Sequence, residues 1–218
     1  MIIAIDGPAG SGKSTLGRML AKALNLLYID TGSMYRAVAL ATLEAELDPA
    51  NADAVSDLAQ RIEIDLEGDP DSLRVWLAGR DVTERIRDDD ITAMSSVVST
   101  IPGVRRAMVV RQREMGKRGA VLNGRDIGTV VFPDADIKFF LDAAPEERAA
   151  RRFNEDKLVH PDATLAQTLV EINERDRRDS TRADSPLKIA ADAIVIDSTG
   201  LSIEAVLDRM MEHVHRNH

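Results

Sequence analysis

The sequence predicts an α/β protein whose parallel sheet is covered by helices on both faces. Short, continuously apolar runs recur along the chain and end at Gly, Asp or Asn, which is typical of buried strands. Between several of them lie segments with apolar residues at i, i+3 and i+4, the spacing of an amphipathic helix. The 218 residues are 44% hydrophobic and 30% charged, so the chain is long and apolar enough to build a folded core.

The first elements alternate between strand and helix. Ile2–Ile5 is predicted as a strand that ends at Gly7-Pro8, and the apolar spacing in Lys13–Leu24 predicts a helix after it. Leu26–Ile29 is the second predicted strand and Met34–Leu47 the second helix. The later elements of this alternation are strands at Gly119–Leu122, Ile137–Leu141 and Ala193–Ile196, and a closing helix at Leu201–Met211. Five such strands favour a parallel sheet.

One segment departs from this alternation. Ile62–Leu66 and Leu73–Leu77 each alternate apolar and polar residues, and Gly68–Asp71 lies between them, so we predict an antiparallel hairpin. This hairpin belongs to a predicted insert at residues 59–100. For Gly79-Arg80-Asp81, which follows the second hairpin strand, we expect an ordinary turn.

The composition limits the possible chemistry and the expected cellular location of the protein. The chain has no cysteine, which excludes disulfides, thiolate zinc sites and a cysteine nucleophile. No stretch approaches the roughly 20 apolar residues that span a bilayer. The apolar N-terminus has no basic residue before it and ends at Asp6, unlike a signal peptide. We therefore expect a cytoplasmic protein without a membrane partner.

The charge is acidic overall but basic in places. A net charge of −9 makes nucleic acid a poor candidate partner, because nucleic-acid binding needs a basic face. Residues 101–125 nevertheless hold seven basic residues and one acidic residue. Such a cluster fits a pocket for a small anion, or a helix with a solvated basic face.

The clearest motif is the segment from Gly7 to Ser14, which matches the phosphate-loop pattern G-x-x-x-x-G-K-[ST]. A strand precedes it and a helix follows, so backbone N–H groups and the helix N-terminus would face a triphosphate. Lys13 would reach the β- and γ-phosphates, and the Ser14 hydroxyl would bind Mg²⁺. The predicted ATP phosphate-binding residues are Gly7, Pro8, Ala9, Gly10, Ser11, Gly12, Lys13, Ser14 and Thr15. The alternative is a simple Gly-rich turn.

A phosphate loop identifies the ligand class but not the reaction. The chain has no N-K-x-D motif for guanine, which argues against a GTPase. A small-molecule kinase needs a second, Arg-rich site for the phosphoryl acceptor. Asp30–Arg36 and Gly124-Arg125-Asp126 both follow predicted strands, where ligands of open parallel sheets bind. Arg36 and Arg125 could bind an acceptor phosphate, and Asp126 could accept a hydrogen bond from a base amine. Thr31 and Ser33 also fit a helix N-cap.

A third Arg-rich region lies near the C-terminus. Arg175, Arg178, Asp179 and Arg182 fall on one helix face, and Arg148, Arg151 and Arg152 form a similar stripe upstream. A polar stretch joins the two segments, so we predict a short lid at about residues 148–168 that closes over phosphates. Surface i, i+4 ion pairs are the alternative.

With these motifs in hand, the chain resembles the bacterial-type cytidylate kinases over essentially its whole length. The resemblance rests on Ile5–Ser14, Asp30–Arg36, Gly124–Ala135 and Glu174–Arg182. It implies a P-loop kinase core of residues 1–58 and 101–218 with strand order 2-3-1-4-5 and a monophosphate-binding insert at residues 59–100. It also implies transfer of the ATP γ-phosphoryl group to CMP or dCMP with Mg²⁺. From the same resemblance we expect a monomer.

The resemblance assigns roles residue by residue. Lys13, Arg125 and Arg178 match catalytic positions. Ser96, Arg105 and Asp126 match cytosine-contacting residues. Thr31, Tyr35, Arg36 and Arg125 match the residues around the CMP phosphate. Arg175, Asp179 and Arg182 match those that reach the sugar and phosphate, while Arg148, Arg151, Arg152 and Arg178 match the lid.

One position departs from the family pattern. The residue before Gly124-Arg125-Asp126 is usually acidic in related kinases and lies near the water shell of Mg²⁺, whereas here it is Asn123. We therefore expect weaker Mg²⁺ binding with the chemistry intact. The competing interpretations are a P-loop kinase for another small acceptor, a nucleotide-dependent switch, and an RNA-binding module that uses residues 101–125.

Overall fold

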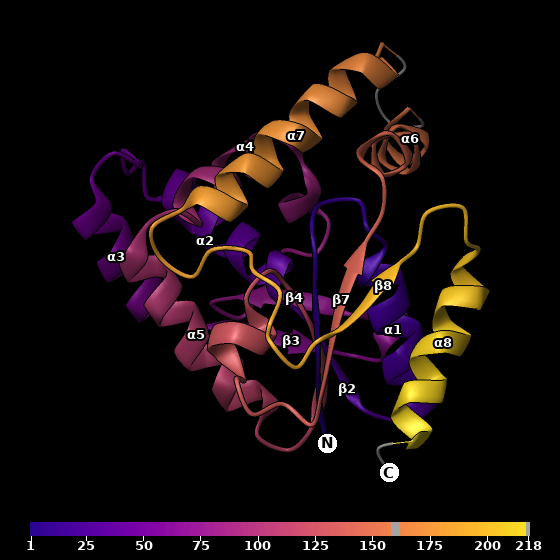
Figure 1. Ribbon diagram of the computed structural model, residues 1–218. Coiled ribbons are helices and arrows are strands. Elements are labelled where there is room, and N and C mark those ends of the chain that lie inside the picture. The colour runs from indigo at the N-terminus through magenta and orange to yellow at the C-terminus, as the bar shows by residue number, and fades with distance from the viewer. Residues whose placement is uncertain (158–161, 217–218) are drawn as a thin grey trace.

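The computed structural model describes residues 1–157 and 162–216. Its centre is a five-stranded parallel sheet in the order β2-β6-β1-β7-β8 (Figure 1). Numbered among themselves along the chain, these strands lie in the order 2-3-1-4-5, so the predicted topology is confirmed. The strands are β1 (Ile2–Asp6), β2 (Leu27–Asp30), β6 (Ala120–Asn123), β7 (Ile137–Asp142) and β8 (Ile194–Asp197).

Two hydrophobic cores lie on opposite faces of this sheet. Successive strand residues point to opposite faces, so Ile3 and Ile5 belong to one core and Ala4 to the other. Helices α1 (Lys13–Leu24) and α8 (Ile203–Arg216) cover the first face. Helices α2 (Thr31–Glu44) and α5 (Pro102–Gly116) cover the second. Apolar residues on both faces explain why the strand sequences are continuously hydrophobic.

The segment between α2 and α5 carries the predicted hairpin and two further helices. Strands β3 (Ile64–Glu67) and β4 (Arg74–Leu77) pair antiparallel, so the hairpin prediction is confirmed. Ile64, Val75 and Leu77 contribute to the same core as α2. Helices α3 (Ala52–Arg61) and α4 (Asp89–Val98) flank this small sheet, with short 3-10 turns at Pro70–Ser72 and Arg85–Arg87.

The expectation of an ordinary turn at Gly79-Arg80-Asp81 is wrong in part. Ala78 and Gly79 form the turn with φ values of 48° and 75°, and the next two residues pair with β4 as a third strand, β5 (Arg80–Asp81). A two-residue turn with positive φ at both positions matches the twist of antiparallel strands, so the ladder continues beyond it.

Two helices differ in length from their predictions. Helix α2 begins at Thr31, three residues before the predicted start, because the Asp30 side chain caps it by accepting from Gly32 N at 3.0 Å. It ends at Glu44 instead of Leu47. Helix α8 continues to Arg216, past the predicted end at Met211, because Val214 extends its buried face.

Helices α6 (Pro145–Asp156) and α7 (Leu165–Thr181) pack together above the carboxyl ends of the strands (Figure 1). A capping box at Thr164 and Gln167 starts α7. Both helices fall within or beside the predicted lid at about residues 148–168, of which residues 158–161 lie outside the described part of the chain. Within the described ranges, no helix combines the length and apolarity needed to cross a membrane.

Candidate functional site

A cleft of about 1030 Å³ opens at the carboxyl ends of β1, β2 and β6. Because the carboxyl ends of parallel strands share one edge, the motifs that follow these three strands converge there. Most of the predicted site residues line this cleft. They are Ala9, Gly10, Gly12, Lys13, Ser14, Thr15, Thr31, Tyr35, Arg36, Ser96, Arg105, Arg125, Asp126, Arg151, Arg152, Arg175, Arg178, Asp179 and Arg182.

The phosphate loop runs between β1 and α1. A Cβ at Gly7, where φ is 148°, would lie 2.0 Å from the carbonyl oxygen of Leu141, so only glycine allows the loop to pack against β7. Gly7, Pro8 and Ser11 lie beneath the loop surface, and the described lining of the cleft does not include them. The Ser11 hydroxyl donates to the Pro8 carbonyl at 3.0 Å, which closes the loop from inside.

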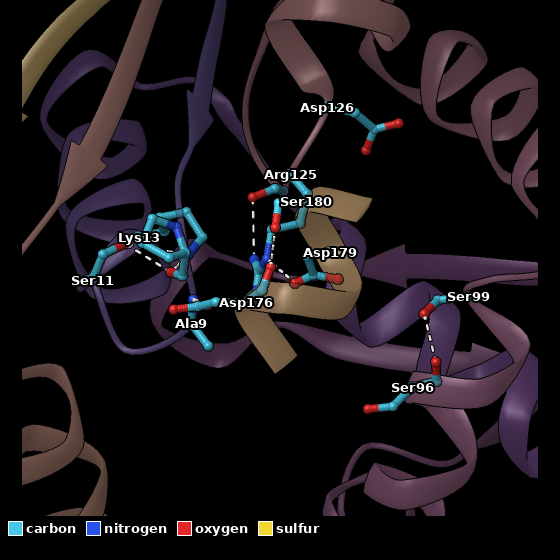
Figure 2. Close-up of polar contacts among 12 residues, drawn as sticks. Ala9, Ser11, Lys13, Ser96, Ser99, Arg125, Asp126, Asp176, Asp179 and Ser180 are labelled. Carbon is cyan, nitrogen blue, oxygen red and sulfur yellow. Dashed lines mark hydrogen bonds and ion pairs between the residues drawn. The ribbon is translucent and has the colours of Figure 1, made fainter. Parts of the chain in front are cut away.

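Lys13 lies folded against this loop. Its Nζ donates to the Pro8 carbonyl and, at 3.3 Å, to Ser11 Oγ (Figure 2). Burial holds the pKa of Lys13 well below its usual value, and the nearby Arg125 and Arg175 lower it further. A bound anion would raise the lowered pKa of Lys13 and favour its protonated form. The burial of this side chain therefore favours the binding of an anion next to it.

Ser14 lies beside the side-chain amide of Asn123. Asn123 Nδ2 donates to Ser14 Oγ at 3.1 Å, while the buried Asn123 Oδ1 has no hydrogen-bond partner among the described residues. Hydroxyl and amide oxygens suit a hard cation that keeps most of its water ligands, as Mg²⁺ does. The residues around Ser14 therefore fit Mg²⁺ held through water and phosphate oxygens, without a carboxylate from position 123.

On the far side of the cleft, Arg105 and Asp126 form a buried ion pair. Arg105 Nη2 donates to Asp126 Oδ2 at 2.6 Å, and the two side chains are only 2% and 7% exposed. Arg182 Nη2 lies 3.6 Å from the other Asp126 oxygen. The guanidinium of Arg105 also stacks 5.3 Å from the centre of the Tyr35 ring, whose pKa burial raises to about 12. This arrangement fixes the Asp126 carboxylate as a hydrogen-bond acceptor.

Between this pair and the phosphate loop lies a cluster of arginines. Arg125 Nε donates to Asp179 Oδ2 at 2.8 Å, and Arg182 Nη1 donates to Asp179 Oδ1 at 3.4 Å (Figure 2 shows the first pair). Burial alone would raise the pKa of Asp179, but Arg125 and Arg175 hold it below its usual value. Burial lowers the pKa of Arg175 to about 10, and the next-largest contribution is the positive charge of Arg125.

Three further residues of the predicted acceptor site donate hydrogen bonds to backbone carbonyls. Thr31 Oγ1 donates to the Asn123 carbonyl at 2.8 Å, which joins the start of α2 to the end of β6. Arg36 Nη1 donates to the Ile86 carbonyl at 3.1 Å. The Ser96 hydroxyl donates to the Thr92 carbonyl within α4 at 3.4 Å. These bonds orient the side chains along the cleft wall.

The lid arginines do not share one environment. Arg151, Arg152 and Arg178 line the cleft, whereas Arg148 is 4% exposed and lies outside its described lining. Arg151 donates to Glu147 and to Ser198, so it also connects α6 with the loop after β8. Arg148 is bound to backbone carbonyls and to Asp176.

The cleft contains residues that the sequence analysis did not single out. Arg18 and Arg87 add positive charge to it. Helix α4 and its C-cap contribute a row of hydroxyl groups in addition to Ser96, namely Thr92 and Ser95 on the helix and Ser99 at the cap. Their spacing of i, i+3 and i+7 places them on one helical face, a pattern that can be read from the sequence.

Comparison with known proteins gives a consistent result. The family model described as cytidylate kinase matches residues 3–216. A cytidylate kinase from Solibacter usitatus is 48% identical over 98% of this chain and 92% of its own length. One from Mycobacterium avium is 46% identical over 99% of this chain and 96% of its own length. The fold also resembles a solved structure of an uncharacterized protein from Eubacterium ventriosum, with a TM-score of 0.57, 13% identity and coverage of 99% and 98% of the two chains.

Proposed function

The chain belongs to the cytidylate kinase family, and on this premise we propose how its cleft phosphorylates CMP or dCMP with ATP. The enzyme is an ATP-dependent CMP kinase. The observation that best supports our assignment of the site is the crowding of buried cations. Burial, and then the positive charges of Arg125 and Arg175, lower the pKa of Lys13. Burial, and then the charge of Arg125, lower the pKa of Arg175, and phosphate groups are the natural counter-charge.

We assign the donor side to the phosphate loop. Backbone N–H groups of the loop and the N-terminus of α1 would hold the β- and γ-phosphates of ATP. Lys13 would leave its present carbonyl partner and bind the γ-phosphate, where it neutralises charge that moves during transfer. Ser14 Oγ would hold Mg²⁺ with Asn123 directed to a metal-bound water, and the ion supplies charge neutralisation on the phosphate oxygens.

We assign the acceptor side to the opposite wall. Asp126, fixed by Arg105 and Arg182, would accept a hydrogen bond from the N4 amine of cytosine, with Ser96 beside it. Uracil has a carbonyl in place of that amine, so it would leave the buried carboxylate facing an acceptor. Thr31, Tyr35, Arg36 and Arg125 would hold the CMP phosphate, and Arg175, Asp179 and Arg182 would reach sugar and phosphate.

The reaction we propose is direct, in-line transfer of the γ-phosphoryl group. An oxygen of the CMP phosphate attacks the γ-phosphorus while the bond to the β,γ-bridging oxygen of ATP breaks, which gives CDP and ADP. The attacking oxygen is already anionic, so no general base is required. Arg125 and Arg178, with Lys13, would position the phosphates and stabilise the transferring group. Arg151 and Arg152 would act from the lid.

All assigned subsites lie within one chain, which supports a monomer as the working unit. A cleft of this volume suits small nucleotides, and the net charge of −9 favours neither nucleic acid nor an anionic membrane as a partner. We further propose that the enzyme acts in the cytoplasm.

The first experiment measures ADP release with ATP and Mg²⁺ against CMP, dCMP, UMP, AMP, GMP, dTMP, shikimate and no acceptor. We expect rapid turnover with CMP and dCMP and much slower turnover with UMP. Equal use of CMP and UMP would contradict the role of Asp126. Turnover with none of the acceptors would contradict the kinase assignment and favour a nucleotide-dependent switch.

A further inference from the structure

The phosphate loop is tied to helix α7 by a carboxylate that lines neither proposed substrate subsite. Asp176 Oδ1 accepts a hydrogen bond from the backbone N–H of Ala9 at 3.2 Å. Its other oxygen, Oδ2, accepts from Arg148 Nη1 at 2.5 Å. Figure 2 shows Asp176 directed at the loop beside Ala9. A residue on α7 thus binds the main chain of the loop across 167 positions of sequence.

Arg148 completes the contact from helix α6. Its Nη1 donates to the Ala9 carbonyl at 3.0 Å, and its Nε donates to the Ala143 carbonyl at 2.9 Å. The N–H of Ala9 is therefore bound by Asp176 and its C=O by Arg148. The side chains of Arg148 and Asp176 are 5% and 20% exposed, so solvent screens this pair only weakly.

The backbone is shaped to allow this contact. A Cβ at Gly10, where φ is 75°, would lie 2.9 Å from the Arg148 carbonyl oxygen and 3.1 Å from its Cβ. Helix α6 therefore packs directly on the loop, and a side chain at position 10 would force them apart.

We propose that Asp176 is a positioning residue for the transfer reaction. Through Ala9 and Arg148 it holds the phosphate loop in its nucleotide-binding shape and fixes α7 against that loop. The inference rests on the proposed role of the loop in binding ATP. A loop that is ordered before the nucleotide arrives loses less conformational entropy on binding, so removing the tie weakens nucleotide binding. The proposed cytosine-binding site does not depend on the contact of Asp176 with the phosphate loop, because Asp126 is held by Arg105.

The test compares Asp176→Ala with Glu174→Ala. Glu174 is an exposed acidic residue on the same helix, so its replacement removes the same charge without touching the loop. Calorimetric titration measures the Kd of ADP with Mg²⁺ and, separately, the Kd of CMP alone. For Asp176→Ala we expect the ADP Kd to rise about tenfold and the CMP Kd to change less than about twofold. Glu174→Ala should change neither.

A graded variant and the melting temperature separate positioning from general stability. Asp176→Asn keeps an oxygen that can accept from Ala9 but loses the charge facing Arg148, so its ADP Kd should lie between those of wild type and Asp176→Ala. An unchanged or tighter ADP Kd in Asp176→Ala would overturn the proposal. So would a parallel rise in both Kd values together with a fall in Tm, which indicates loosened structure. If the wild-type chain did not phosphorylate CMP at all, the proposed function itself would be refuted, whatever the Asp176 variants showed.

Discussion

Lys13 is a buried side chain whose pKa is strongly lowered. It is 6% exposed, and its hydrogen bonds stay within its own loop. Burial and neighbouring arginines lower its pKa, so its charge is unfavourable in the absence of an anion. A group of this kind serves binding and chemistry at some expense to stability.

For Lys13→Ala we expect an unchanged or slightly raised Tm and a loss of kcat of about 100-fold or more, because charge neutralisation at the transferring phosphate is removed. Circular dichroism and an ADP-release assay measure the two quantities. Lys22→Ala is the control, since Lys22 pairs with Asp71 on the surface where such pairs contribute little. Wild-type-like turnover of Lys13→Ala would refute the assigned role.

Asn123 stands where the family resemblance leads us to expect an acidic residue. Its amide Nδ2 donates to Ser14 Oγ, and its buried Oδ1 has no hydrogen-bond partner within residues 1–157 and 162–216. A carboxylate there would accept a hydrogen bond from Ser14 and add a negative charge near the proposed cation. For Asn123→Asp we therefore expect a lower Mg²⁺ concentration at half-maximal activity, with kcat changed less than about threefold.

Two independent measurements test the effect of Asn123→Asp on metal binding. One is activity as a function of Mg²⁺ concentration. The other is Mn²⁺ binding in the presence of ADP, followed by the electron paramagnetic resonance signal of free Mn²⁺. Asn123→Ala, which removes the oxygen, is the opposite control. An unchanged midpoint in Asn123→Asp would contradict the idea that this position faces the metal-bound water.

Sequence reasoning succeeds for residues that belong to motifs at strand ends. Thr31, Arg36, Arg125 and Asp126 converge in the cleft because parallel strands share one carboxyl edge. It does not identify Asp6 or Asp176, whose partners lie 121 and 167 positions away. An Arg–Asp stripe also looks the same whether it faces solvent, phosphate or a buried carbonyl. For that reason the burial of Arg148 could not be predicted.

At the scale of elements, Asp6 connects the end of β1 with the short π-helical turn at Ile127–Val131. Its two carboxylate oxygens accept from Ile127 N at 2.8 Å and Gly128 N at 2.7 Å. This turn directly follows Asp126, so the strand that leads into the phosphate loop also anchors the acceptor motif. Burial raises the pKa of Asp6 to about 6 in spite of these bonds.

The raised pKa of Asp6 predicts a pH dependence of stability. The folded chain holds a proton at Asp6 more tightly than the unfolded chain, whose value is 3.8. Between about pH 4 and pH 6 the folded state binds more protons, so the contribution of Asp6 to the free energy of unfolding falls as the pH rises. Above about pH 7 this contribution is constant.

Asp6→Asn removes this titration while keeping the shape of the side chain. We expect the Tm difference between wild type and Asp6→Asn to shift in favour of the variant from pH 4 to pH 6 and then to level off. Thermal melts in matched buffers measure it. Asp208→Asn, at an exposed acid on α8, is the control for the loss of one carboxylate. A flat curve for Asp6→Asn would contradict the prediction, because it would show that folding does not change the pKa of Asp6.

Elements differ in how well their boundaries follow from the pattern. Helix α1 coincides with its prediction because its apolar stripe and its Gly-rich entry are both local signals. Helix α2 begins earlier than predicted because an Asp30 cap, not the first apolar residue, sets its start. Strand β5 was missed because two residues carry too little periodicity to mark a strand.

For the whole molecule, the charge distribution is uneven. The chain carries a net charge of −9, yet the cleft gathers Lys13, Arg36, Arg125 and Arg175 among its lining residues. An acidic exterior repels large polyanions, while a basic, partly desolvated cleft attracts small anions.

The fold class and the faces of the sheet follow from local patterns in the sequence. The strand order required the family resemblance, since apolar strands carry no information about their neighbours.

The strand order also determines when the nucleotide site can exist during protein synthesis. The first two strands to leave the ribosome, β1 and β2, are not neighbours, and each pairs with β6, which starts at Ala120. The phosphate loop emerges almost at once but has no flanking strand until more than half of the chain has been made. Formation of the site is therefore postponed to a late, long-range step, and the nascent chain carries unpaired apolar strands until then.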